Sequence, residues 1–264
     1  MLEKLFSIKA SGSSVKSEII GGLTTFLTMA YIIFVNPSIL SETGMDYGAV
    51  FVATCLAAAI GCLIMGLWAN YPVALAPGMG LNAFFTYTVV FSMGYTWQTA
   101  LGAVFFSGCL FFLLSAFRVR EWIIKSIPTT LRLAIAAGIG AFLALIGLQN
   151  ANIIVANDAT MVSLGSLSEP SVLLAAAGFF LIIGLVARQV QGAALISILL
   201  VTLIAWATGL VEYNGIVSAP PSLLPTFMQM DLAAAFDIGM LSVIFAFLFV
   251  DLFDTSGTLL AVAQ

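Results

Sequence analysis

The chain has 264 residues, of which 62% are hydrophobic and only 8% are charged, whereas a soluble domain carries roughly 25% charged residues. Its formal net charge of −4 and its mean hydropathy of +1.16 exclude a basic nucleic-acid-binding surface and a disordered acidic tail. The chain contains no histidine, which excludes Ser-His-Asp and Cys-His catalytic arrangements and histidine-ligated metal sites. The composition therefore predicts an integral membrane protein.

Apolar stretches close to the length that crosses a hydrocarbon core of about 30 Å as a helix recur along the chain. We expect spans at residues 19–40, 48–68, 97–117, 129–148, 171–187, 193–210 and 233–260. Residues 1–17 are polar, and the first apolar run is too long for a signal-peptide core, so no cleaved signal is expected. The three cysteines, Cys55, Cys62 and Cys109, form no CxxC pair, which indicates packing rather than disulfides or zinc.

Residues 70–91, with the sequence NYPVALAPGMGLNAFFTYTVVF, form an eighth apolar segment. Four extended residues would cover about 13 Å, and a twelve-residue half-helix would add about 18 Å, so together they just span the core. A continuous helix would span it too, but Pro77, Gly78 and Gly80 favour a break at mid-depth. Such a break leaves free backbone N–H groups at the start of a half-helix, where Asn82 adds donors and acceptors. The alternative is a Pro-kinked structural helix in which Asn82 bonds locally.

The distribution of charge decides whether this broken segment crosses, because short cytoplasmic loops collect Lys and Arg. With eight crossings and the N-terminus inside, all eight basic residues fall on one side: Lys4, Lys9, Lys16, Arg118, Arg120, Lys125, Arg132 and Arg188. The charged residues of the loops on the opposite side are all acidic: Glu42, Asp46, Asp158, Glu169, Glu212 and Asp231. If residues 70–91 did not cross, the cluster between residues 118 and 132 would face outward. We therefore predict eight crossings and a cytoplasmic N-terminus.

Three segments that connect the predicted spans have compositions that predict their structure. The stretch FRVREWIIKSIP, residues 117–128, interleaves bases and a Trp with apolar residues, which predicts a helix lying in the cytoplasmic interface. The outer loop 149–170 is long enough to hold short extended pieces. The loop 209–231 contains three prolines and reads as a linker, so we place a boundary near residue 232.

Asp251 and Asp254 lie in an otherwise apolar span, where a charged residue costs roughly 2.5 to 3.5 kcal/mol on insertion scales. If the span enters from outside near Ile238, Asp251 lies about 20 Å deep, in the inner half of the bilayer. The i,i+3 spacing places both carboxylates on one face of the helix. We interpret them as a substrate and proton site; the alternative is that the helix ends early and both are interfacial caps.

Asn36 is the remaining polar residue in the middle of a span, in YIIFVNPSIL. The sequence FVN at residues 34–36 matches FVD at residues 249–251. Seven crossings between two similar helices would invert the second copy, which is the arrangement of inverted-repeat transporters. The alternative is that Asn36 simply caps a kink before Pro37.

Three blocks of sequence resemble a known family: GGLTTFLTMAYIIFVNP (21–37), AVFVATCLAAAIGCLIMGLWANYPVALAPGMGLNAFF (49–85) and FVDLFDTSGTL (249–259). They are similar to the AzgA-like purine nucleobase permeases of the nucleobase:cation symporter-2 family. The resemblance implies an all-α polytopic membrane protein with seven plus seven inverted crossings, of which this sequence matches the first half. It implies a core-domain half at 1–117, an interfacial helix and gate-domain half at 118–232, and the start of the second repeat at 233–264.

The resemblance also implies import of adenine, guanine or hypoxanthine by proton symport. On the matching positions, the resemblance implies Asn82, Asp251 and Asp254 as the polar contacts and the coupling group. We therefore expect substrate binding by Asn36, Gly80, Leu81, Asn82, Phe84 and Asp251, and proton coupling by Asp251 and Asp254. A carboxylate can accept from a purine ring N–H, while backbone N–H groups and Asn82 serve the ring acceptors, and Phe84 or Phe85 can supply a flat contact. A carboxylate in a low dielectric favours its protonated form, so it can load and release a proton.

Further expectations follow from the resemblance. The protein would be a multi-pass protein of the cell membrane (inner or plasma membrane), in contact with the lipid bilayer. Its partners would be a purine nucleobase and a proton, and a homodimer is an assembly that it could form. No enzymatic activity, cofactor, metal or nucleic-acid partner is expected. The sequence stops at Gln264, whereas the family pattern has six further spans.

Alternatives remain at this point. The main one is a truncated, non-transporting membrane fragment or scaffold. An intramembrane aspartyl protease also uses two aspartates, but these must face each other from different helices, and no GxGD sequence occurs. An anion exchanger of the same architecture would need a positive or neutral site where Asp251 and Asp254 stand.

Overall fold

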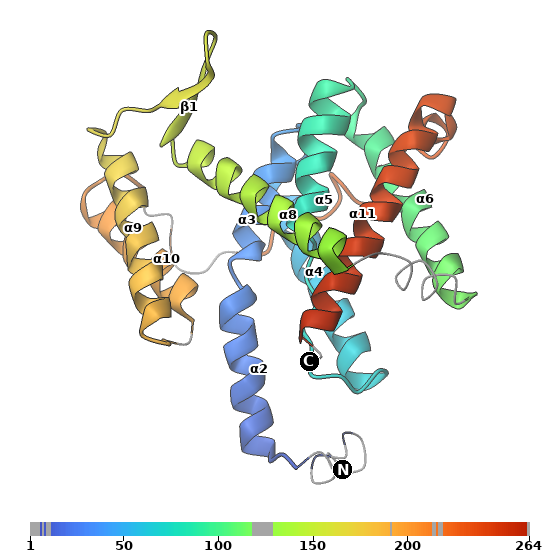
Figure 1. Ribbon diagram of the computed structural model, residues 1–264, viewed down its shortest axis with the longest axis horizontal. Coiled ribbons are helices and arrows are strands. Elements are labelled where there is room, and N and C mark those ends of the chain that lie inside the picture. Colours follow the sequence, from blue (N-terminus) through green and yellow to red (C-terminus); the bar gives the residue numbers. More distant parts are fainter. Residues whose placement is uncertain are drawn as a thin grey trace. The chain divides into compact units, whose positions relative to one another are not determined.

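The computed structural model describes residues 6, 8, 12–117, 129–190, 192–212, 215 and 219–262, and it is mostly helical (Figure 1). Side chains are described up to Phe253, except at several positions of helix α8. Within the described residues, four helices are long and apolar enough to cross a membrane: Val15–Ser41, Tyr47–Leu67, Trp97–Ala116 and Pro170–Ala187. Shorter apolar helices lie at Met79–Ser92, Ala193–Ala207 and Ile238–Phe253. The prediction of a helical, multi-pass membrane protein is confirmed, whereas eight crossings stay a prediction.

The chain folds into two compact units. Unit 1 contains Met1–Ile33, Ala58–Ala76 and Ala144–Ala219, and unit 2 contains Phe34–Ala57, Pro77–Leu143 and Pro220–Gln264. The division predicted from the resemblance, with boundaries at residues 117 and 232, stays a prediction.

The first predicted span, residues 19–40, consists of two helices, α2 (Val15–Met29) and α3 (Ile32–Ser41). Helix α2 begins four residues before the expected start because the Ser14 side chain accepts a hydrogen bond from the Ser17 N–H at 3.2 Å, which is a favourable N-cap. The break follows a run of threonines whose hydroxyls donate to carbonyl oxygens of the preceding turn, a pattern that bends helices. Pro37 inside α3 also removes one backbone bond at its first turn.

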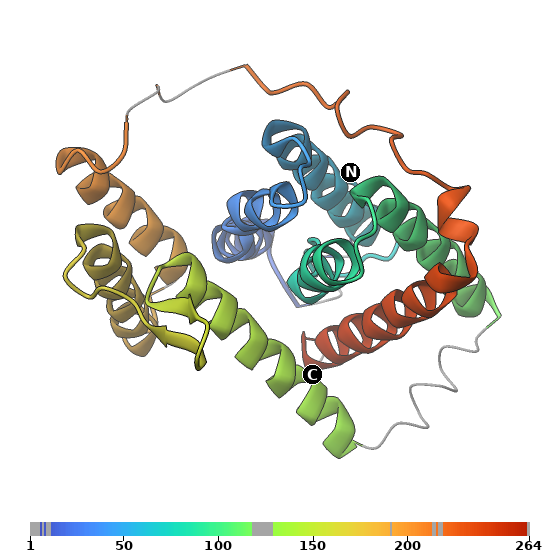
Figure 2. The ribbon, with the colours of Figure 1, turned by 90° about the horizontal axis from the view of Figure 1, so that it is seen from above.

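Helices α9 (Pro170–Ala187) and α10 (Ala193–Ala207) form a pair in unit 1, lying side by side in Figures 1 and 2. Gly178 permits their close approach, since a Cβ there would lie 2.8 Å from Cγ2 of Val201. The buried Ser197 hydroxyl donates to the Gly178 carbonyl oxygen at 2.9 Å, so small residues and a polar bond join the helices as in membrane bundles. Helix α10 ends at residue 207 rather than 210, followed by Gly209 with a φ of 74°, a conformation that ends helices.

Helix α8 (Thr129–Asn150) leads into an antiparallel hairpin of β1 (Ile154–Asn157) and β2 (Met161–Leu164), with Ile154 opposite Leu164 and Asn157 opposite Met161. The turn is closed by Asn157, whose side-chain oxygen accepts from the N–H groups of residues 159 and 160. The extended pieces expected in the loop 149–170 are therefore confirmed. They form a two-stranded antiparallel sheet.

Unit 2 is built on helix α6 (Trp97–Ala116), which packs against α11 (Ile238–Val262) (Figure 1). It also contains the first half of α4 (Tyr47–Leu67), helix α5 (Met79–Ala83) and the π-helical turn η1 (Phe84–Ser92). Apolar side chains from these elements, with one from the turn before α4, form one buried cluster: Met45, Val50, Phe85, Val89, Ala100, Ala103, Met240, Val243, Ile244 and Phe247. Helix α11 begins at Ile238, five residues after the expected start, because residues 234–236 form a separate 3-10 turn, η2 (Ala234–Phe236).

The predicted linker before α11 is anchored to α6. The Asp231 N–H donates to the Gln98 carbonyl oxygen at 3.0 Å, and a Cβ at Gly102 would lie 2.5 Å from the Asp231 carbonyl oxygen. Only glycine therefore fits at this position of α6 without displacing the linker. The interfacial helix predicted in residues 117–128 lies outside the described residues except for Phe117, so it stays a prediction.

Residues 71–78 are not helical, and helix α5 begins at Met79. The Cys62 thiol of α4 donates to the Leu75 carbonyl oxygen at 3.4 Å and accepts from the Leu75 N–H at 3.2 Å. Backbone groups outside a helix need such partners when they are shielded from water. Cys62 thus bonds the non-helical stretch, a role beyond the packing expected for it.

Candidate functional site

A chain of side-chain hydrogen bonds joins α3, α4 and α5 inside unit 2. Asn82 of α5 donates from Nδ2 to Oδ1 of Asn36 on α3. Asn36 donates from its own Nδ2 to Oγ1 of Thr54 on α4 at 2.6 Å, and Thr54 Oγ1 donates to the Val50 carbonyl oxygen at 2.7 Å. Asn36 and Thr54 are each only 3% exposed, so these polar groups satisfy one another inside the unit, as buried polar groups must.

Two further bonds join η1, which continues α5, to α3 and to the residue that follows α3. Thr86 of η1 donates to the Ile39 carbonyl oxygen at 3.2 Å, and Tyr87 donates to Oε1 of Glu42 at 3.1 Å. Residues 82, 86 and 87 thus bond residues 36, 39 and 42 in the same order. The helical segment after Met79 therefore runs parallel to α3.

The start of α5 carries the predicted backbone site. Gly78 occupies the N-cap position with an extended backbone, φ −77° and ψ 123°, and has no side chain with which to cap the helix. Gly80 and Leu81 follow in the first turn and are half-buried, as is Asn82. The N–H groups of a first turn point out of the helix end and lack carbonyl partners within it, so they are suited to bind an electron-rich ligand atom.

Helix α11 contacts this segment through aromatic rings. The Phe84 ring lies edge-on to the Phe247 ring at a centroid distance of 5.1 Å, and Phe85 lies 6.5 Å from Phe247. Asp251 lies one turn beyond Phe247 on the same face of α11 and is half-buried. The Asp254 side chain lies outside the described residues, although its backbone belongs to α11.

The structure thus gathers several predicted residues and adds two others. Asn36 and Asn82 are hydrogen-bonded to each other, Phe84 contacts Phe247, and Asp251 shares a face of α11 with Phe247. Sequence reasoning missed Thr54 and Phe247. Thr54 is one of few polar residues in its span, but a threonine in a membrane helix often bonds its own backbone, so the sequence signal is weak.

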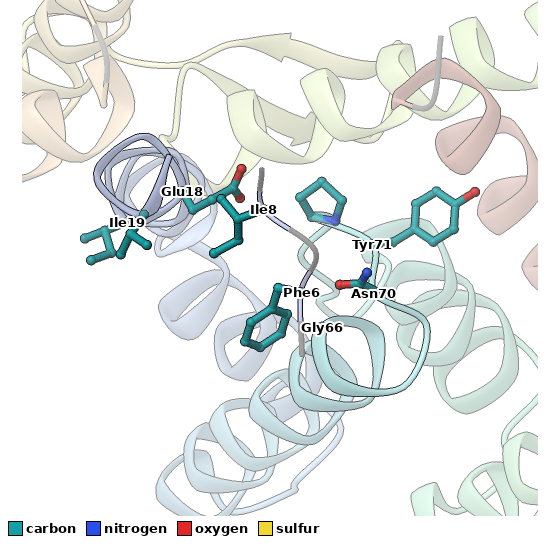
Figure 3. A pocket seen from close by; sticks show the side chains of 9 residues that line it. Phe6, Ile8, Glu18, Ile19, Gly66, Asn70 and Tyr71 are labelled. Carbon is teal, nitrogen blue, oxygen red and sulfur yellow. The ribbon is translucent and has the colours of Figure 1, made fainter. Parts of the chain in front are cut away.

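A pocket of about 490 Å³ lies elsewhere, in unit 1 (Figure 3). Its walls include Phe6, Ile8 and Ile19 together with the polar residues Glu18 and Asn70. It lies between the N-terminal residues, α2 and the turn that follows α4. None of the predicted site residues lines it, so it is distinct from the candidate site.

Comparisons with known proteins match nearly the whole chain, and all of them point to permeases. A model of the Permease family matches residues 16–264. Adenine permease AdeP of Escherichia coli is 53% identical over 264 residues, which cover 100% of this chain and 59% of that protein. Putative permease MJ0326 of Methanocaldococcus jannaschii is 54% identical over 100% of this chain and 61% of its own length. Guanine/hypoxanthine permease PbuG of Bacillus subtilis is 47% identical, with 99% and 62% covered.

The chain thus spans about three fifths of the length of these relatives, from 59% to 62%. The sequence blocks that suggested a family, residues 21–37, 49–85 and 249–259, all fall within the matched range. The similarity is therefore continuous along the chain and does not depend on a single motif.

Proposed function

Because the chain belongs to the Permease family, we propose that it takes part in the import of purine nucleobases across the cell membrane, as a transporter and not as an enzyme. The observation that carries this proposal is the 53% identity, over the whole chain, to a protein named adenine permease. The relative named guanine/hypoxanthine permease supports a purine base as the substrate class. The coupling ion in this proposal is a proton.

The proposed topology has eight crossings with a cytoplasmic N-terminus. Its critical element is residues 70–91, which cross as a short extended piece followed by a half-helix. The parallel pairing of this half-helix with α3 supports a crossing in the same direction as the first span. In the proposed topology α4 returns between them, so a crossing of residues 70–91 in this direction agrees with the one-sided distribution of basic residues.

The proposed architecture is the first part of an inverted repeat, with a core domain and a gate domain. The core comprises residues 1–117 and 233–264, and the gate lies at 118–232. The packing of α11 against α6 and α5 supports placing the last span with the core. The pairing of α9 with α10 supports a separate gate half.

The proposed purine site lies between the start of α5 and helix α11. Backbone N–H groups at Gly80 and Leu81, with the Asn82 amide, bind the edge of the base. Phe84 provides an apolar contact for a purine face, and Asp251 accepts from a ring N–H. Asn36 belongs to this site through its bond to Asn82.

Proton coupling is assigned to Asp251 with Asp254. A carboxylate in an apolar span is costly in its charged form, so binding a proton together with the substrate lowers the cost of the loaded state. Asp251 stands on the face of α11 that meets the half-helix, which supports direct communication between the proton and substrate sites.

The test is uptake by the protein expressed from its complete coding sequence in cells that lack purine uptake. We expect accumulation of labelled adenine, guanine or hypoxanthine that is abolished by a protonophore and competed by unlabelled purines but not by pyrimidines. A membrane-localised protein that gives no uptake of any purine would contradict the proposal and favour the non-transporting scaffold.

A further inference from the structure

We infer that Thr54 is a positioning residue that sets which end of the Asn82 amide faces the substrate. This inference rests on the proposed function, because it specifies how one group of the purine site is oriented. The evidence for it is the series of hydrogen bonds from Asn82 through Asn36 to Thr54. The sequence pattern does not indicate that these three residues contact one another.

The direction of every bond in this chain follows from its last member. The Val50 carbonyl oxygen can only accept a hydrogen bond, so the Thr54 hydroxyl donates its single proton to that oxygen, at 2.7 Å. Its oxygen then accepts from its other neighbour, which requires the NH₂ group of Asn36 at 2.6 Å. Asn36 therefore turns its carbonyl oxygen toward Asn82, and the Asn82 atom that meets it must be the NH₂ group.

This order leaves Asn82 with a defined free edge. One N–H of its amide is used by Asn36, so a carbonyl oxygen and one N–H remain. Within the described residues, no donor bonds that oxygen. The edge is complementary to a ligand that donates an N–H beside an acceptor, which is the pattern presented by a purine ring N–H and its neighbouring ring nitrogen or carbonyl.

The orientation is held because reversing it would cost a hydrogen bond. Asn36 and Thr54 are each 3% exposed, and a flipped Asn36 amide would place its oxygen against the hydroxyl oxygen unless Thr54 gave up its bond to the Val50 carbonyl. Buried acceptors facing each other cannot be relieved by water at such a site. Without the Thr54 hydroxyl, both orientations of Asn36 become equivalent, and Asn82 loses its fixed edge.

The test compares Thr54→Val with Thr54→Ser in the full-length protein. Valine keeps the shape of threonine but removes the hydroxyl, whereas serine keeps the hydroxyl. Uptake KM is measured for hypoxanthine, and inhibition constants are measured for its 1-, 7- and 9-methyl derivatives, each of which lacks one ring N–H. The size of the added methyl group is the same for every variant. A change between variants in the ratio of a derivative's inhibition constant to the KM for hypoxanthine therefore reports the lost hydrogen bond and not the size of the methyl group.

We expect wild type and Thr54→Ser to reject at least one methyl derivative strongly. Thr54→Val should raise the KM for hypoxanthine about tenfold, the factor for a lost hydrogen bond of about 1.4 kcal/mol, and leave the constant for that derivative unchanged. The discrimination should therefore shrink about tenfold, while the maximal rate per membrane-localised protein stays within about twofold.

A second variant covers failure of Thr54→Val to fold. The double change Asn36→Leu with Thr54→Val replaces both partners by apolar groups, which avoids an unsatisfied buried amide, and should lose discrimination in the same way. Equal shifts for all ligands, unchanged discrimination in either variant, or a wild type that rejects no derivative would overturn the positioning role. If wild type transports no purine at all, the proposed function fails and this inference fails with it.

Discussion

Asn36 and Asn82 are 46 residues apart in the sequence and directly hydrogen-bonded in the structure. Within the described residues, the side-chain bonds of Asn36 reach two other helices, through Asn82 and Thr54. A role limited to capping the kink at Pro37 would not require those partners. Single polar side chains at this junction therefore connect three apolar helices, α3, α4 and α5.

Asn82→Ala should raise the apparent KM for purine uptake by about tenfold, because the substitution removes one hydrogen-bonding group worth about 1 to 1.5 kcal/mol. It also leaves the buried Asn36 oxygen without its donor. The measurement is concentration-dependent uptake, normalised to the amount of protein in the membrane. An unchanged KM for adenine, guanine and hypoxanthine would show that the substrate does not bind at the start of α5.

Asp251→Asn should abolish proton-driven accumulation while preserving the fold, because the amide keeps the volume of the carboxylate but cannot exchange a proton at this site. Purine counterflow, which needs no net proton movement, should survive better than uphill uptake. Both are measured in the full-length protein reconstituted in vesicles with an imposed pH gradient. Normal uphill accumulation by this variant would contradict a coupling role for Asp251.

At the scale of elements, the non-helical stretch 71–78 is stabilised by a residue of the preceding helix. Lipid offers no hydrogen bonds, so irregular backbone in a bilayer must be satisfied by protein groups. The Cys62 thiol supplies both a donor and an acceptor to Leu75. Gly61 is adjacent, and a Cβ there would lie 3.3 Å from Cβ of Leu75, so the α4 surface at this point is shaped for the stretch.

Cys62→Ala should lower the free energy of unfolding by about 1 kcal/mol, because two backbone groups of Leu75 lose their partner. Cys62→Ser should retain more stability, since its hydroxyl can make both bonds with a small shift. The midpoint of thermal unfolding in detergent gives the comparison, and Cys109→Ala serves as the control because Cys109 is exposed. Equal midpoints for the Ala and Ser variants of Cys62 would remove the role of the thiol.

Gly102→Ala should destabilise the protein by about 1 to 3 kcal/mol, the usual cost of overpacking. The new Cβ would lie 2.5 Å from the Asp231 carbonyl oxygen and 2.7 Å from Cβ of Ala235, which displaces the linker before α11. Gly108→Ala on the same helix is the matched control, since nothing lies within 4 Å of its added Cβ, and it should be neutral or slightly stabilising. Thermal unfolding of both variants tests this; similar midpoints would contradict the close contact.

For the whole molecule, the distribution of charge and the direction of the helices both bear on whether residues 70–91 cross the membrane. All eight Lys and Arg residues share one side if eight segments cross, which the positive-inside rule favours. The parallel bonds between the half-helix and α3 are independent of that count. Both observations support the proposed crossing of residues 70–91, and the proposed topology then has an extracellular hairpin at β1 and β2 and a cytoplasmic turn between α9 and α10.

The topology is tested with single cysteines placed in these two turns, in a background in which the natural cysteines are replaced. Asp158→Cys in the hairpin turn should react with a membrane-impermeant maleimide in intact cells. Gln189→Cys, in the turn after α9, should react only after permeabilisation. The reverse pattern, or labelling of both in intact cells, would contradict the proposed crossing of residues 70–91.

The membrane class, the approximate positions of the helices and the family could all be inferred from the sequence alone. These features depend on composition, local runs of apolar residues and the intrinsic limits of Pro and Gly, so they can be inferred from neighbouring residues alone. The break after Met29 and the late start of α11 were missed because local hydrogen bonds and caps shift helix ends within apolar runs.

Which polar groups contact one another became visible only in the folded chain. Thr54 and Cys62 each carry a weak signal in the sequence, yet Thr54 orients an amide pair and Cys62 bonds an irregular backbone. Phe84 and Phe85 look alike in the sequence, but Phe85 is buried in the cluster while Phe84 remains half-buried beside Phe247. Such differences arise because hydrogen bonds and burial between helices depend on how distant segments pack, which apolar periodicity does not specify.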